Sequence, residues 1–147
     1  MAALDALARR DYASEDLRLK LLEKGYDVSV VSLLLDALRD EKLLDDRRYA
    51  ENFVTYHAAR GQGPLRIRRD LHRHGLRGQA AQEYLDAYPD WIGQLQKARL
   101  KKFGAEPPKT YTDRQLQARF LGYRGFTSAQ IRMALGFDVE LDSDQET

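Results

Sequence analysis

The chain has 147 residues, of which 43% are hydrophobic and 32% charged, and it contains no cysteine. This composition is typical of a soluble folded protein, and the length fits one ordinary domain or an array of small modules. The absence of cysteine excludes disulfides and cysteine-ligated zinc. We find no run of about 18 apolar residues and no signal-peptide pattern, so we expect a cytoplasmic protein without membrane contact.

The net charge of +1 conceals a strong segregation of charge along the chain. Residues 57–79 carry six arginines and one acidic residue, and residues 97–135 carry nine basic and two acidic residues. The intervening and flanking segments are net acidic, and residues 136–147 hold five acidic residues and no basic one. Basic segments of this size attract polyanions or acidic protein surfaces.

Helix signals dominate from the N-terminus onward. Ser14 is a suitable N-cap for a helix that places Leu17 and Leu21 on one face, and Gly25 is a suitable left-handed helix stop. Asp27 can cap the next helix. The apolar stripe of that helix consists of Val31, Leu34, Leu35 and Leu38.

The same signals recur in the middle of the chain. Asp45 or Asp46 can cap a helix that ends at Gly61, and Pro64 suits the first turn of a helix that ends at Gly75. The expected inner faces of these two helices are Tyr49, Phe53 and Tyr56, and then Ile67 and Leu71. A further helix is predicted through Ala81, Tyr84, Leu85 and Tyr88.

The last third begins with a predicted helix through Trp91, Leu95 and Leu100. The stretch 104–112 contains two prolines, and we predict that it is a hinge between the second and third repeats. Asp113 is then expected to cap a helix that ends at Gly125 and buries Leu116, Phe120 and Leu121. Thr127 or Ser128 is expected to cap a short final helix, which brings the predicted number of helices to eight or nine.

Gly25, Gly75 and Gly125 are spaced by 50 residues, and a leucine stands four residues before each and ten residues after each. A large apolar residue follows every one of these glycines. This repeat predicts an all-α protein of three tandem three-helix repeats of about 50 residues, forming an elongated, curved array. We assign the repeats to residues 1–44, 45–88 and 89–136, and residues 137–147 to an acidic, disordered tail. The glycines themselves are expected to be structural helix stops and not contact residues.

The basic segments supply the candidate binding residues, because arginine side chains suit both phosphates and carboxylates. The candidates are Arg60, Arg66, Arg68, Arg69, Arg73, Arg77, Lys97, Lys101, Lys102, Arg119 and Arg124. The alternative interpretation is a set of solvated helix faces. No phosphate-binding loop, paired metal ligands or catalytic triad can be recognised, so we predict no metal, no cofactor and no enzymatic activity.

Four motifs in order resemble the RecX family of bacterial proteins that act on the RecA recombinase. They are Ser14-Glu15-x-Leu17-Arg18-x-Lys20-Leu21 with Lys24-Gly25-Tyr26, Leu43-Leu44-Asp45-Asp46-x-Arg48-Tyr49-Ala50, Gly63-Pro64-x-Arg66-Ile67-x-x-Asp70-Leu71, and Arg119-Phe120-Leu121-x-Tyr123-Arg124-Gly125-Phe126. The resemblance covers about residues 4 to 136.

The resemblance implies a non-enzymatic negative regulator that binds the RecA–DNA filament and restrains filament growth, ATP hydrolysis and strand exchange. It also implies that the candidate basic residues contact RecA, or single- or double-stranded DNA, and we expect the protein to be a monomer. The alternative that the residues themselves leave open is a general DNA-binding helical repeat module, whose binding would depend steeply on salt.

Overall fold

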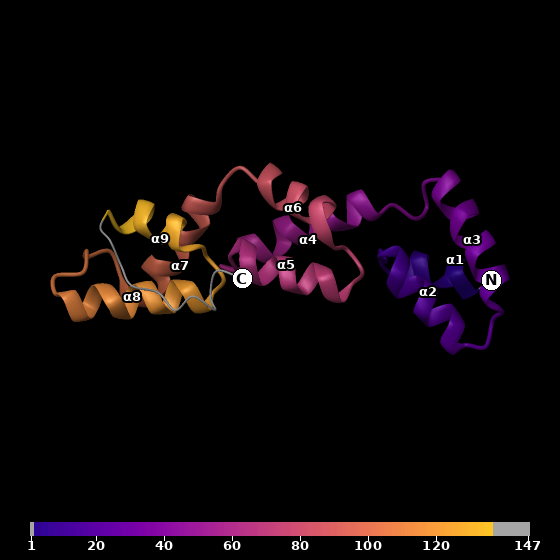
Figure 1. The fold of residues 1–147 in the computed structure, drawn as a ribbon, viewed down its shortest axis with the longest axis horizontal. Coiled ribbons are helices and arrows are strands. Elements are labelled where there is room, and N and C mark those ends of the chain that lie inside the picture. The colour runs from indigo at the N-terminus through magenta and orange to yellow at the C-terminus, as the bar shows by residue number, and fades with distance from the viewer. Residues whose placement is uncertain (1, 137–147) are drawn as a thin grey trace.

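The computed structural model describes residues 2–136, and all regular structure within this range is helical. The helices are α1 (Ala2–Arg9), α2 (Ser14–Glu23), α3 (Val28–Asp40), α4 (Asp46–Ala59), α5 (Pro64–Arg73), α6 (Gly78–Ala87), α7 (Trp91–Phe103), α8 (Tyr111–Tyr123) and α9 (Ser128–Leu135). Figure 1 shows them as three bundles in a row along the longest axis of the molecule. The prediction of an elongated all-α array is confirmed.

Each bundle of three helices encloses its own apolar core. The first bundle (α1–α3) is centred on Leu17, Leu21 and Leu35, and the second bundle (α4–α6) is centred on Ile67 and Leu71. The third bundle (α7–α9) buries Leu95, Ala118, Leu121, Phe126 and Ile131. Trp91 packs against both the second and the third core, so these two bundles share an apolar contact at their junction.

The glycine repeat marks the end of the middle helix in each bundle. Gly25, Gly75 and Gly125 have φ angles of +94°, +84° and +102°, which an amino acid with a Cβ rarely adopts. In each case the N–H of the following apolar residue donates to the leucine carbonyl four residues before the glycine, at 3.2, 3.0 and 3.2 Å. This bond closes a Schellman motif, which explains the fixed positions of leucine, glycine and apolar residue.

Two helix caps differ from the sequence-based expectation. Ser14 is the first residue of α2 and not its cap, and its backbone N–H donates to Asp46 Oδ1 at 2.7 Å. The hydroxyl of Thr110 accepts the bond that caps α8, so Asp113 lies inside the first turn instead of before it. Asp45 and Thr127 cap α4 and α9 as predicted, and Thr127 forms a reciprocal capping box with Gln130.

Three further expectations are wrong. Tyr56 and Leu116 are 54% and 55% exposed, so neither belongs to an inner face. The segment between Gly104 and Thr110 joins α7 to α8, and both helices contribute to the third core. It therefore lies within one bundle and is no hinge between repeats. The predicted tail, residues 137–147, lies outside the described residues. No described helix is long and apolar enough to span a membrane.

Candidate interaction surface

The second and third bundles are joined backbone to backbone, at the point where α5 begins and α8 ends. The N–H of Gly63 donates to the carbonyl of Arg124 at 2.8 Å, and the N–H of Leu65 donates to the carbonyl of Gly125 at 2.9 Å. A helix N-terminus has unpaired N–H groups and a C-terminus has unpaired carbonyls, so each end satisfies the other. The partial positive charge at the start of α5 and the partial negative charge at the end of α8 also attract each other.

Glycine is required on both sides of this joint. A Cβ on Gly63 would overlap the backbone of Gly125 and Phe126, although the φ of Gly63 is an ordinary −89°. A Cβ on Gly125 would lie 2.5 Å from the Cβ of Arg66. The repeating glycine is thus more than a helix stop, because it also lets the preceding bundle approach. The sequence carried only a weak signal for Gly63, a glycine directly before the proline that starts α5.

The side chain of Arg124 adds two hydrogen bonds across this joint. Its guanidinium donates to the carbonyl of Gly61 at 3.0 Å and to that of Arg60 at 2.7 Å, and so binds the carbonyl end of α4. Burial, with a smaller contribution from the nearby Arg66, lowers the pKa of this guanidinium below its ordinary value. Arg124 therefore holds the two bundles in position, whatever contact it makes with a partner.

The joint between the first two bundles also brings a glycine helix end against the start of another helix, with different residues. The first turn of α2 meets the end of α5, where a Cβ on Gly75 would lie 2.5 Å from the Cβ of Glu15. His74 Nδ1 lies 2.7 Å from Asp16 Oδ2 in the same contact. At Gly25, by contrast, a Cβ would have no neighbour within 4 Å. Two of the three glycine ends are therefore covered by the preceding bundle, and the first is open.

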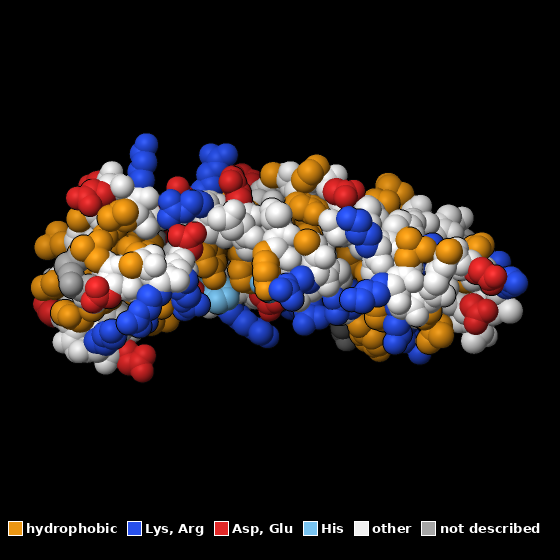
Figure 2. All heavy atoms as spheres, turned by 180° about the vertical axis from the view of Figure 1, so that it is seen from behind, with side chains coloured by type: hydrophobic (Ala, Val, Ile, Leu, Met, Phe, Trp, Pro, Cys, Tyr) orange, Lys and Arg blue, Asp and Glu red, His pale blue; other side chains and the backbone are white. Residues whose placement is uncertain are grey.

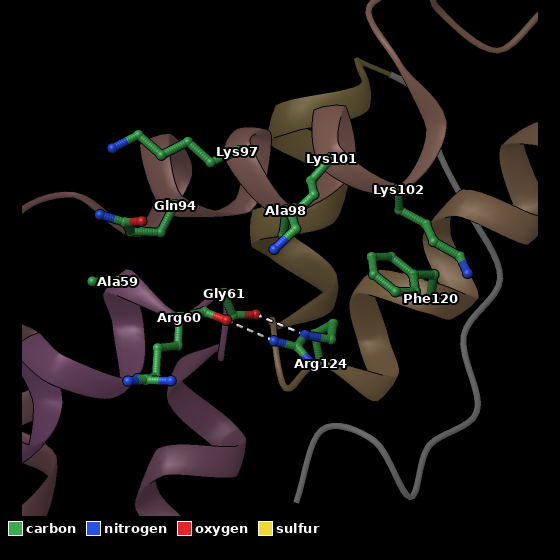
Figure 3. Close-up of a pocket in the computed structure, with 10 residues that line it drawn as sticks. All are labelled: Ala59, Arg60, Gly61, Gln94, Lys97, Ala98, Lys101, Lys102, Phe120 and Arg124. Carbon is green, nitrogen blue, oxygen red and sulfur yellow. Dashed lines mark hydrogen bonds between the residues drawn. The ribbon is translucent and has the colours of Figure 1, made fainter.

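A basic cleft of about 400 Å³ lies beside the joint of the second and third bundles. We use "basic cleft" for the residues that line it, which come from the end of α4, from α7 and from α8: Ala59, Arg60, Gly61, Gln94, Lys97, Ala98, Lys101, Lys102, Phe120 and Arg124. Figure 3 shows the side chains of Lys97 and Lys101 on α7 above Arg60 and Arg124, with Phe120 at one end. The tertiary structure thus brings together basic residues that are up to 64 positions apart.

The basic cleft is strongly electropositive, because five of its residues are basic and none is acidic. None of the ion pairs formed within residues 2–136 involves Arg60, Lys97, Lys101 or Lys102. The guanidinium of Arg60 lies 4.3 Å from the centre of the exposed Tyr56 ring, and Lys102 Nζ lies 5.8 Å from that of Phe120. Cations without internal acidic partners can bind an external anion without breaking an existing pair.

The remaining candidate residues do not form one continuous face. Arg66 is half-buried against Gly125, and it acts with Arg60 on the same imidazole, that of His57. Burial first, and then these two arginines and His74, lower the pKa of His57, while Asp70 opposes them. Arg66 therefore lies beside the joint, and it does not line the basic cleft.

The other candidate arginines, on α5, on α8 and directly before α6, do not line the basic cleft. Arg68 lines a separate groove with Asp86 and Trp91. Arg73 lies 3.5 Å from Asp70, Arg77 donates to the carbonyl of His72, and Arg69 and Arg119 are exposed. On the face drawn in Figure 2, basic side chains recur along the lower long edge and also project from the upper edge, where acidic side chains lie among them.

Comparison with known proteins assigns the chain to a family. The family model of the second three-helix domain of RecX matches residues 45–85, and that of the third three-helix domain matches residues 92–135. The chain belongs to the RecX family. The regulatory protein RecX of Halorhodospira halophila is 42% identical over 146 residues, which cover 99% of this chain and 89% of that protein. The regulatory protein RecX of Acidithiobacillus ferrooxidans is 43% identical over 140 residues, covering 95% and 90%.

Solved structures show the same fold. The crystal structure of RecX from Lactobacillus salivarius superposes with a TM-score of 0.81 at 20% identity, covering 92% of this chain and 90% of that one. A second crystal structure of a regulatory protein RecX gives a TM-score of 0.75 at 24% identity over 91% of this chain and 68% of that one. The family resemblance stated from the four sequence motifs is confirmed.

Proposed function

We propose that the protein is a non-enzymatic negative regulator of the RecA recombinase, which binds the RecA–DNA filament and restrains its growth, ATP hydrolysis and strand exchange. The observation that carries this proposal is the basic cleft in a chain of the RecX family. Its five basic residues and lack of acidic ones suit an acidic protein surface or DNA phosphates. The elongated row of bundles in Figure 1 suits a protein that follows a filament.

The proposal treats the protein as a binding module that acts in the cytoplasm as a monomer. The charged residues are used for contact and not for chemistry, because a regulator needs only differential affinity for two states of its target. Within the described range, no group of three or more His, Asp or Glu residues could hold a metal ion. Relatives named regulatory proteins are consistent with this assignment.

The test is RecA-dependent ATP hydrolysis on single-stranded DNA with the protein titrated in. We expect inhibition at or below one molecule per RecA subunit, and its absence there would refute the proposal. Replacing Lys97, Lys101 and Lys102 together by glutamine should raise the half-inhibiting concentration by tenfold or more, because exposed charges act mainly on encounter and long-range attraction. The matched control replaces Arg9, Lys24 and Arg39, which are exposed residues of the first bundle, and should change it little.

A general DNA-binding module is the second candidate function, and the same cations support it. It predicts binding to DNA without RecA, with an affinity that falls steeply as salt increases, because each phosphate contact releases counterions. Fluorescence anisotropy with a labelled single strand at several salt concentrations separates the two. Tight binding to RecA in the absence of DNA would count against this alternative.

A further inference from the structure

The same kind of joint occurs twice within the chain, and one half of a further joint is exposed at each end of the row of bundles. In both joints the start of one middle helix covers the glycine that ends the middle helix of the next bundle: α2 covers Gly75, and α5 covers Gly125. The glycine that ends α2, Gly25, and the start of α8 are not covered in this way. We call residues 24–26 and residues 110–113 the open ends, and Figure 1 shows them toward opposite ends of the longest axis.

Burial at equivalent positions shows what a joint covers. The first residues of α2 and α5, Ser14 and Pro64, are buried, whereas Tyr111, the first residue of α8, is 62% exposed. The apolar residue after the glycine is 1% exposed in the third bundle (Phe126) and 46% exposed in the first (Tyr26). Terminal units of a repeat array usually present a polar outer face that keeps the arrays apart. Here an aromatic side chain lies exposed at each open end.

The open ends also carry complementary charges. In the joint of the first two bundles, Oδ2 of Asp16, the third residue of α2, lies 2.7 Å from Nδ1 of His74, the residue before the glycine. The equivalent residues at the open ends are Asp113, the third residue of α8, and Lys24. Neither forms an ion pair within the described part of the chain. Contact between the open ends would bring this carboxylate and this ammonium to the positions that Asp16 and His74 occupy.

The residue before the middle helix decides which of the two joints the open ends resemble. Between the second and third bundles, the equivalent charges are both positive, on Arg66 and Arg124, and the joint depends on backbone bonds that only Gly63 has room to make. Thr110 stands at this place before α8, and Ala13 stands there before α2. The open ends therefore match the joint of the first two bundles, in which opposite charges meet.

The bundles behind the open ends have opposite net charges. Residues 1–44 hold nine acidic and seven basic residues, and residues 91–136 hold two acidic and nine basic ones. This difference favours the encounter of unlike ends and disfavours that of two third bundles. A groove of about 260 Å³ beside Asp113, lined in part by Pro108 and Leu116, offers apolar surface that Tyr26 can cover.

We propose that the open ends are a self-association site, at which the start of α8 in one copy of the chain covers the end of α2 in a second copy and Asp113 pairs with Lys24. Such a head-to-tail contact does not close, so copies add in a row. Within one chain the connecting segments give the bundles a high effective concentration, which separate copies lack. The dilute protein is therefore a monomer, and the contact forms where copies are crowded end to end. A RecA filament is such a place, and this consequence alone rests on the proposed function.

Nuclear magnetic resonance of the 15N-labelled full chain measures the contact without any partner. When the concentration rises from about 0.05 to about 1 mM, the amide signals of residues 23–28 and 110–116 should shift together, because both ends are covered in one event. The signals of residues 78–87, which form α6 in the central bundle, should stay in place and serve as the internal control. About 0.5 M salt should reduce the shifts, since the pair is exposed and is screened.

Charge reversal identifies the pair and the direction of the contact. Lys24→Glu and Asp113→Lys should each raise the dissociation constant roughly 3- to 10-fold, because like charges then face each other. Both residues are exposed, so the fold is expected to be retained. A mixture of the two variants should regain the original affinity, because every contact between unlike copies joins opposite charges. The control variants Arg9→Glu and Glu83→Lys change exposed residues outside the open ends and should leave the constant nearly unchanged.

Three results would overturn the inference. The first is an absence of shifts at the open ends up to about 1 mM. The second is a set of shifts that persists undiminished in Lys24→Glu or in Asp113→Lys, since it would exclude this ion pair. The third is a mixture that associates as weakly as each variant alone, since it would exclude the head-to-tail direction. Because no measurement contains RecA, self-association without inhibition of RecA would refute the proposed function and not this inference.

Discussion

The same substitution made at two of the repeated glycines can distinguish two roles of glycine, which are ending a helix and allowing two bundles to pack closely. Gly25→Ala and Gly125→Ala place the same side chain at the same position of equivalent Schellman motifs, with φ +94° and +102°. Both changes incur the left-handed penalty of about 1–2 kcal/mol. Only Gly125→Ala adds a steric overlap, since its Cβ would lie 2.5 Å from Arg66 Cβ and 2.8 Å from Arg66 N. The Cβ of Gly25→Ala would have no neighbour within 4 Å.

The expected difference is the cost of forcing that overlap apart, about 1–3 kcal/mol beyond the common penalty. Urea unfolding followed by circular dichroism should therefore give Gly125→Ala a loss of about 2–5 kcal/mol and Gly25→Ala a loss of about 1–2 kcal/mol. Trp91, the single tryptophan, packs against the second and third cores and reports on their junction. Its fluorescence transition should shift in Gly125→Ala and stay unchanged in Gly25→Ala.

Equal destabilisation of the two variants would refute the reasoning, because it would mean that the left-handed conformation alone matters at both positions. Gly75→Ala is an independent repetition of the test. Its Cβ would lie 2.5 Å from Glu15 Cβ at the other joint, so it should behave like Gly125→Ala in circular dichroism.

The remaining predictions concern the charged residues of the same region. Arg124→Ala should lower the free energy of unfolding by about 2–3 kcal/mol, because two carbonyls lose a charged donor, while Arg119→Ala, exposed on the same helix, should stay within about 0.5 kcal/mol in urea unfolding. Burial lowers the pKa of His57 from 6.5, so the unfolded chain takes up a proton first, and stability should decrease as the pH falls below about 6.5. Urea titrations at several pH values should show a smaller decrease for His57→Gln; a decrease as large as that of the unchanged protein would contradict this assignment.

Much of the fold could be predicted because its signals are local. Helix stripes such as Ile67 and Leu71, the cap at Asp45 and the stops at the three glycines depend on residues within a few positions of one another. The misplaced cap at Ser14 has a non-local cause. Serine is a residue type that often caps helices, but the backbone N–H of Ser14 donates a hydrogen bond to the carboxylate of Asp46, 32 residues away. Nothing in a local pattern could reveal that competing partner.

The candidate interaction surface could also be predicted from the sequence only in part. Charge blocks in the sequence identified the basic residues, and 11 positions were expected to act together. The structure gathers Arg60, Lys97, Lys101, Lys102 and Arg124 into the basic cleft and separates Arg68 from them. Helix periodicity gives the direction of a side chain relative to its own core, but not which neighbouring helix faces it.

By itself, the sequence determined the number of repeats, the helices and the overall separation of charge, because backbone propensity, apolar periodicity and charge are properties of short segments. Only the tertiary structure decided how the repeats are joined. Gly63 and Gly125 allow two helix ends to bond directly, and Arg124 fixes that joint instead of standing free. The basic cleft exists because this joint sets α7 beside the end of α4, and contacts between residues some 60 positions apart determine that geometry.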